Sequence, residues 1–117
     1  MNHHGSKRKL GREKGVREAL IKSLGRSLVK YGRIQTTEAK AKELRPWIER
    51  LVTKARSGKL ASERAVISAF GNDEIAFKLI KDIAPRMKER PGGYTRVIKV
   101  MGKRADASPE AIIEFVA

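Results

Sequence analysis

The stretch IQTTEAKAKELRPWIERLVTKAR, residues 34–56, predicts a short extended link that runs directly into a long helix. Thr36 or Thr37 can cap this helix, and Glu38 then lies in its first turn, where a carboxylate interacts favourably with the helix dipole. Apolar residues recur at helical spacing as far as Arg56, which gives the helix one apolar stripe. The members of this stripe are Ala41, Leu44, Ile48, Leu51, Val52 and Ala55.

Pro46 interrupts this pattern, because proline lacks the backbone N–H that a helix interior uses. Either the helix kinks there, or a second helix begins with Pro46 in its first turn. We expect one kinked helix, since the apolar stripe stays in phase across the proline. For the neighbouring Trp47, a partly buried packing role is favoured over stacking on a nucleic-acid base.

The segment that precedes this stretch predicts another helix, over residues 13–31. Val16, Leu20, Leu24 and Leu28 recur at every fourth position and, with Ile21 beside them, form one apolar stripe. Gly32 suits the left-handed cap that ends many helices.

Two further helices are predicted after the central stretch. Residues 60–70 form the first, and Gly71 ends it. Asn72 is a favourable cap for the second, which carries apolar residues at helical spacing between 75 and 83. We expect this helix to stop at Pro85.

The C-terminal third predicts a β-hairpin. Residues 95–101 and 111–116 are rich in β-branched side chains, and the segment between them suits a long loop. Two strands alone are marginally stable, so helices must cover one face, and residues 34–36 can add an edge strand. We therefore predict a two-layer α/β fold of about four helices beside a small sheet with a C-terminal β-hairpin.

The charge of the chain is large and clustered. The 117 residues include 27 Lys and Arg against 13 Asp and Glu, a net charge of +14. Most of the excess lies in residues 1–33 and 85–104, whereas residues 59–84 are neutral and residues 105–117 are acidic. Such clustering is typical of a protein that binds a polyanion. We expect residues 1–12 to be a basic arm, disordered alone, and residues 13–117 to be a single globular domain.

Several classes of function are disfavoured. Cysteine is absent, which excludes a disulfide scaffold, a thiolate zinc site and a Cys nucleophile. No apolar run exceeds three residues, so we expect no transmembrane helix and no membrane partner. His3 and His4 are adjacent in the arm and lack nearby ligands, so no metal or other cofactor is predicted. Without a Walker loop or a nucleophile motif, we predict that the protein is not an enzyme.

Two segments are candidates for binding phosphates. In the arm, the basic side chains can contact phosphates, and the net charge favours this over a solvated tail. In the segment 91–96, PGGYTR, the glycines allow a close backbone approach, Thr95 can bond to a phosphate and Tyr94 can stack on a base. An ordinary turn with Tyr94 in the core is the alternative, and the residues alone leave these two even. Lys103 and Arg104 in the adjoining loop can extend the segment into a basic edge.

These residues resemble a known family. The run 34–42, IQTTEAKAK, followed by ERLVTKAR at 49–56, is similar to the signature of the bacterial large-subunit ribosomal protein seventeen family. The segments KLGR at 9–12, GGYTR at 92–96 and AIIE at 111–114 agree in the same order, so the resemblance spans essentially the whole chain.

The resemblance implies a structural, non-catalytic component of the large ribosomal subunit, located in the cytoplasm on the ribosome. It implies as partners the large-subunit ribosomal RNA and neighbouring ribosomal proteins near the exit region, with no cofactor and no homo-oligomer. The predicted RNA-binding residues are His3, Ser6, Lys7, Arg8, Lys9, Arg12, Lys14, Arg17, Thr36, Thr37, Lys40, Lys42, Gly92, Gly93, Tyr94, Thr95, Arg96, Lys103 and Arg104. A nucleoid-type or regulatory DNA-binding protein is the alternative, since basic helices and a β-ribbon also suit duplex DNA.

Overall fold

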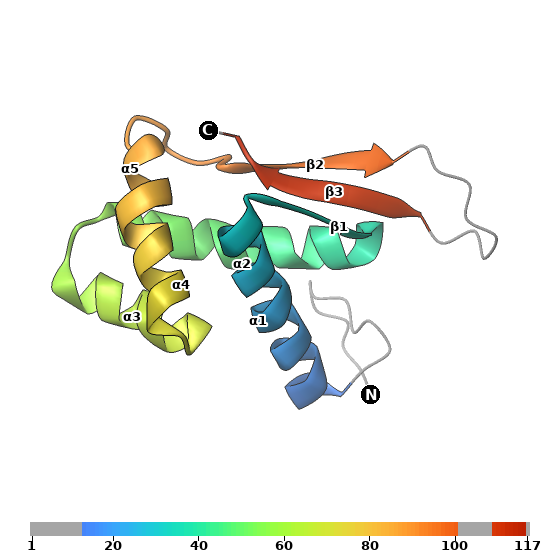
Figure 1. The fold of residues 1–117 in the computed structure, drawn as a ribbon, viewed down its shortest axis with the longest axis horizontal. Coiled ribbons are helices and arrows are strands. Elements are labelled where there is room, and N and C mark those ends of the chain that lie inside the picture. Colours follow the sequence, from blue (N-terminus) through green and yellow to red (C-terminus); the bar gives the residue numbers. More distant parts are fainter. Residues whose placement is uncertain (1–12, 101–108, 117) are drawn as a thin grey trace.

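The computed structural model describes residues 13–100 and 109–116, which form helices on one side of a small sheet (Figure 1). The elements are, in chain order, α1 (Lys14–Tyr31), β1 (Arg33–Thr37), α2 (Glu38–Arg56), α3 (Leu60–Phe70), α4 (Asp73–Lys78), the π-helix η1 (Leu79–Ile83), α5 (Ala84–Arg86), β2 (Thr95–Val100) and β3 (Glu110–Phe115). This confirms the predicted fold class. No helix among the described residues is long and apolar enough to cross a membrane.

The sheet has three antiparallel strands in the order β1-β3-β2. The last strand in sequence therefore lies at the centre, paired with Arg33–Thr37 on one side and Thr95–Val100 on the other. Ala111, Ile113 and Phe115 are buried, and the β3 residues between them are half-exposed. This alternation means that one face packs on the helices and the other is open. The predicted edge strand at 34–36 is confirmed, whereas most of the predicted hairpin loop lies outside the described residues.

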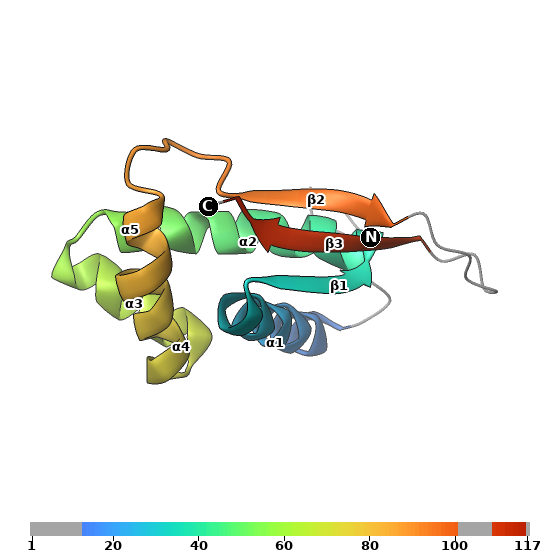
Figure 2. The ribbon, with the colours of Figure 1, turned by 45° about the horizontal axis from the view of Figure 1, so that its top comes forward.

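Helix α2 runs along the packed face of the sheet (Figure 2). Its cap is Thr37, whose hydroxyl oxygen accepts a hydrogen bond from the Lys40 backbone N–H at 3.3 Å. The helix continues through Pro46 as a single element, as predicted, and every residue of the predicted apolar stripe is buried. The sequence 34–56 thus supplies an edge strand and the helix on which the sheet packs.

Helix α1 packs through only part of the predicted stripe. Ile21 and Leu28 are buried as predicted, together with Gly25 and Val29, whereas Val16 is 53% exposed. Four residues advance an α-helix by slightly more than one turn, so a stripe of period four rotates by about 40° at each step. Over three steps this drift carries Val16 away from the face that contains Leu28.

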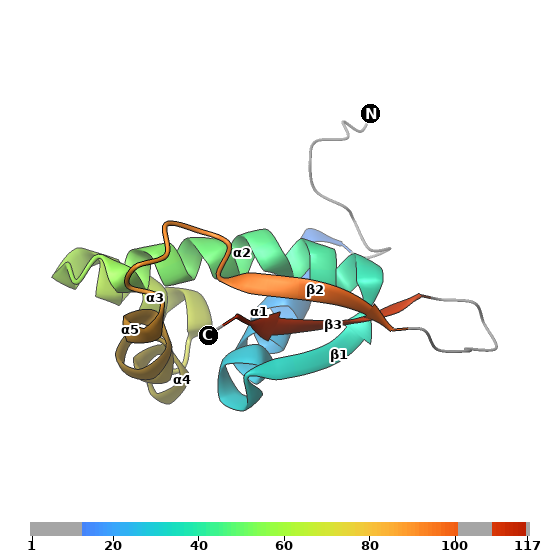
Figure 3. The same ribbon diagram turned by 90° about the horizontal axis from the view of Figure 1, so that it is seen from above.

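Trp47 is half-buried and makes a packing contact, as the sequence favoured. Its ring meets that of Phe70 edge to face, with centroids 5.5 Å apart and an interplanar angle of 90°. The contact connects α2 to α3. Helices α3, α4 and α5 gather at one end of the sheet (Figure 3).

The helix that follows Asn72 does not stop at Pro85, contrary to the prediction. The Asn72 cap is present, since its side chain accepts from the Ile75 N–H at 3.0 Å. The chain then widens into η1, where the Ala84 N–H bonds to the Leu79 carbonyl, and continues into α5. The wider turn places Pro85 in the first turn of α5, a position that needs no N–H donor.

Candidate nucleic-acid interface

The predicted RNA-binding residues of the arm and of the hairpin loop lie outside the described residues. They are His3, Ser6, Lys7, Arg8, Lys9, Arg12, Lys103 and Arg104. The other predicted residues are described, and the structure separates them into several places.

Tyr94 and Thr95 belong to the interior. Tyr94 is 1% exposed, and its hydroxyl oxygen accepts a hydrogen bond from Arg56 Nη1 at 2.7 Å. Thr95 is also buried, and its hydroxyl donates to Glu49 Oε2 at 2.8 Å. The expected stacking face on Tyr94 and the expected phosphate contact of Thr95 are therefore corrected, because both polar groups are used inside the protein. The other interpretation is correct: Tyr94 is a core residue directly before β2.

Side chains on one face of α2 form hydrogen bonds to both ends of the segment 87–94, which connects α5 to β2. The Glu49 carboxylate accepts the backbone N–H groups of Tyr94 at 3.2 Å and Thr95 at 2.8 Å. Seven residues further along, Arg56 Nη2 donates to the Lys88 carbonyl at 2.9 Å. Charge-assisted hydrogen bonds of this kind are roughly twice as strong as neutral ones. They fix the position of Gly93, which is exposed and has a left-handed φ of 64°.

Arg96 lies in a cross-strand row on the open face of the sheet. In the strand register, Glu114 of the central strand lies opposite both Arg33 and Arg96. Its two carboxylate oxygens lie 3.6 Å from Arg33 Nε and 2.9 Å from Arg96 Nε. One acidic side chain therefore holds two arginines, and the row keeps an excess positive charge.

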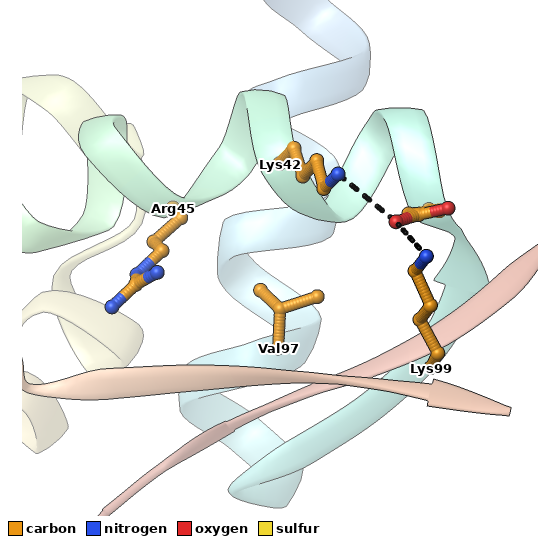
Figure 4. Close-up of a pocket in the computed structure, with 5 residues that line it drawn as sticks. Lys42, Arg45, Val97 and Lys99 are labelled. Carbon is orange, nitrogen blue, oxygen red and sulfur yellow. Dashed lines mark ion pairs between the residues drawn. The ribbon is translucent and has the colours of Figure 1, made fainter.

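Lys42 lines a hollow of about 480 Å³ between α2 and β2 (Figure 4). The other lining residues are Glu38, Arg45, Val97 and Lys99. Glu38 Oε2 lies 2.9 Å from Lys42 Nζ and 3.7 Å from Lys99 Nζ. The hydrogen bond from Lys42, reinforced by the charge of Lys99, lowers the pKa of the Glu38 carboxyl below its usual value.

Arg45 and Lys99 are functional candidates that the sequence did not reveal. Arg45 shares a face of α2 with Glu38 and Lys42, which the helical spacing of these residues could have indicated. Lys99 arrives from a distant strand and has no local signal. No cluster of three or more His, Asp or Glu side chains in the described part of the chain could hold a metal ion.

A comparison with known protein families identifies the family to which this chain belongs. Residues 20–116 match the family model described as Ribosomal protein L17. The chain belongs to the ribosomal protein L17 family. The predicted resemblance is thereby confirmed.

Relatives of this L17-family chain are similar to it over their whole length. It is 49% identical to the Large ribosomal subunit protein bL17 of Campylobacter jejuni subsp. doylei over 117 residues, which are 100% of both chains. The protein of the same name from Campylobacter lari is 48% identical over the same share. That of Nautilia profundicola is 46% identical over 120 residues, covering 99% of this chain and 98% of its own.

The remaining predicted RNA-binding residues of the L17-family chain are exposed to different extents. Thr37 serves as the cap of α2, and Thr36 and Lys40 are half-buried beside it. Lys14 is exposed in the first turn of α1, and Arg17 is half-buried one turn later. Only part of this set is therefore open to a partner, and Thr36, Thr37 and Lys40 lie at the junction between β1 and α2.

The basic run 85–104 of the L17-family chain is divided by the fold. Lys88 and Arg90 are exposed beside the C-terminal half of α2, where Arg50 and Lys54 are also exposed. Arg96 and Lys99 lie on β2 instead, and Lys99 reaches the N-terminal turn of α2. One charged run in the sequence thus contributes to two separate basic surfaces.

Proposed function

We propose that this chain is a structural component of the large ribosomal subunit, in the cytoplasm, and that it binds ribosomal RNA. The main support is that the chain belongs to the ribosomal protein L17 family and is similar over its full length to relatives named Large ribosomal subunit protein bL17. A structural role agrees with the sequence prediction that the chain is not an enzyme. The same membership argues against the alternative of a DNA-binding protein.

The binding mechanism that we infer is neutralisation of phosphates by cations fixed on a rigid scaffold. Each Lys or Arg that contacts a phosphate releases condensed counterions, which favours binding at low salt. The described surface offers such cations at both ends of α2, with Lys42 and Arg45 at one end and Lys54 and Lys88 at the other. The arm adds a further set of cations at residues 7–12, for which we propose insertion among RNA segments.

The structural role also requires protein neighbours. We infer that these are other large-subunit proteins near the exit region, and that the chain acts as a single copy. The open face of the sheet, with the Arg33–Glu114–Arg96 row, remains available for such neighbours or for RNA.

Sedimentation of a cell lysate tests the proposed function. We expect an epitope-tagged full-length chain to sediment with the large subunit and to leave it only in concentrated salt. A chain found free at the top of the gradient would contradict the proposal. In competition binding, large-subunit RNA should displace the chain from duplex DNA, and the reverse preference would support a DNA-binding protein.

A further inference from the structure

The hollow between α2 and β2 has two cationic sides and an apolar floor. Arg45 lies on one side of Val97, and Lys42 and Lys99 lie on the other (Figure 4). The side chains of Lys42 and Lys99 are 48% and 73% exposed, so both ammonium groups are accessible from solvent. With Glu38 counted, the lining residues carry an excess of two positive charges.

The internal contacts of the hollow leave most of its hydrogen-bond donors unused. A lysine ammonium has three donors and an arginine guanidinium has five. Lys42 and Lys99 each contact a single oxygen of Glu38, and Arg45 Nη2 donates to the Thr95 carbonyl at 3.3 Å. Exposed ion pairs of this kind contribute little to stability, so they do not explain why three cations face one hollow. Their arrangement does suit an anionic ligand.

We propose that this hollow binds one backbone step of ribosomal RNA. The sugar packs on Val97, one flanking phosphate contacts Arg45, and the other contacts Lys42 and Lys99. The hollow presents a cation, an apolar side chain and then two more cations, which matches the order phosphate, sugar, phosphate in a nucleic-acid strand. A single free anion would contact the cations on only one side of Val97. The inference rests on the proposed function, and it adds Arg45, Val97 and Lys99 to Lys42, which the sequence already predicted to bind RNA.

Tethered cleavage of RNA locates the site directly. Because the chain contains no cysteine, Ala39→Cys introduces a single thiol beside Glu38, at an exposed position that removes no proposed contact. An iron–EDTA group attached there generates hydroxyl radicals that cut nearby RNA. Ala61→Cys, exposed in the first turn of α3, is the matched control. In complexes with large-subunit RNA we expect discrete cuts from position 39 that position 61 does not produce. Absence of cuts from position 39 would overturn the proposal.

Salt dependence measures the number of phosphates in the hollow. The triple variant Lys42→Ala/Arg45→Ala/Lys99→Ala leaves neither proposed phosphate with a cation, so it should flatten the log–log slope of affinity for large-subunit RNA against salt by about 1.5 units, at 0.7–0.9 per contact. Lys59→Ala/Arg64→Ala/Lys81→Ala removes the same number of charges from exposed positions in the neutral segment, and we expect an unchanged slope. Equal slopes for the two triple variants would contradict the assignment.

Two measurements keep this test independent of folding and of the proposed function. Lys42→Ala/Lys99→Ala removes both cations of one proposed phosphate through exposed side chains, and a slope flattened by about 0.8 units supports the site even where Arg45→Ala loosens the strand. If the unchanged chain binds RNA but the hollow variants match their controls, the hollow assignment fails alone. If the unchanged chain shows no preference for large-subunit RNA, the proposed function fails.

Discussion

The ring of Trp47 packs directly on the backbone of Gly25, at the point where α2 meets α1. A Cβ atom added to Gly25 would overlap Cζ3 of the ring, closer than real Cβ contacts come. The same ring meets Phe70 on α3, so Trp47 joins three helices. By contrast, a Cβ added at Gly15, on the same helix, would have no heavy atom within 4 Å.

The two glycines of α1 should therefore respond in opposite directions to the same substitution. We expect Gly25→Ala to lower the free energy of unfolding by about 1–3 kcal/mol, because the added methyl group forces the ring or the helix to move. Gly15→Ala should raise it by roughly 0.5 kcal/mol, since alanine restricts the unfolded chain and meets open space. Urea unfolding measures both, and shifts in the same direction would contradict the packing described here.

The buried hydroxyl of Tyr94 predicts a loss of stability without a loss of binding. Tyr94→Phe removes the acceptor of Arg56 Nη1 and the contact with Thr53 at 3.3 Å, which should cost about 1–2 kcal/mol. RNA affinity should stay the same, because the ring lies in the core. Tyr31→Phe, at an exposed position, is the control and should change neither quantity. Weaker RNA binding by folded Tyr94→Phe would show that the hydroxyl acts in RNA binding and would contradict its purely internal role.

The lowered pKa of Glu38 predicts an acid-dependent contribution to stability. A carboxyl group with a pKa below its ordinary value of 4.5 stabilises the fold at higher pH and loses this contribution as pH falls through the lowered pKa. The melting temperature of the wild type should therefore be higher than that of Glu38→Gln at neutral pH. The two melting temperatures should become equal as the pH is lowered. Lys42 is the main cause of the shift, so in a Lys42→Ala background the neutral-pH difference should shrink. A difference that stays constant from neutral to acidic pH would refute this origin.

The arm predicts a large change in salt dependence. Deleting residues 1–12 removes four Lys and Arg side chains, and the log–log salt slope should flatten by about 3 units if all of them contact phosphates. Replacing Lys7, Arg8, Lys9 and Arg12 by glutamine keeps the length of the arm and should give the same flattening. A slope that the deletion leaves unchanged would show that the arm is merely solvated.

Features that depend on a few neighbouring residues were predicted well. Thr37 and Asn72 cap their helices, and Gly32 and Gly71 end the preceding ones, because a cap involves hydrogen bonds within about four residues. The apolar stripe of α2 was correct for a related reason. Helix α2 is α-helical from end to end, so the spacing of its apolar residues is enough to identify the face that is buried.

Features that depend on a distant partner could not be decided from the sequence. Gly25 is buried because Trp47 packs on it, and Tyr94, for which two alternatives were left open, is buried because Arg56 and Glu49 bond to its segment from α2. Neither fit has a local pattern. The continuation past Pro85 likewise required a π-helical turn, which a proline rule based on a regular α-helix does not include.

The distribution of charge shows the same division. The amount of positive charge, its clustering and its meaning as a footprint for a polyanion follow from counting residues, since net charge does not depend on the fold. Which cations lie together on one surface, by contrast, depends on the fold. Strand β3 enters between β1 and β2, which brings Lys99 to the first turn of α2 beside Glu38 and Lys42. Electrostatic interactions depend on distances in space, and strand order sets those distances for residues far apart in the chain.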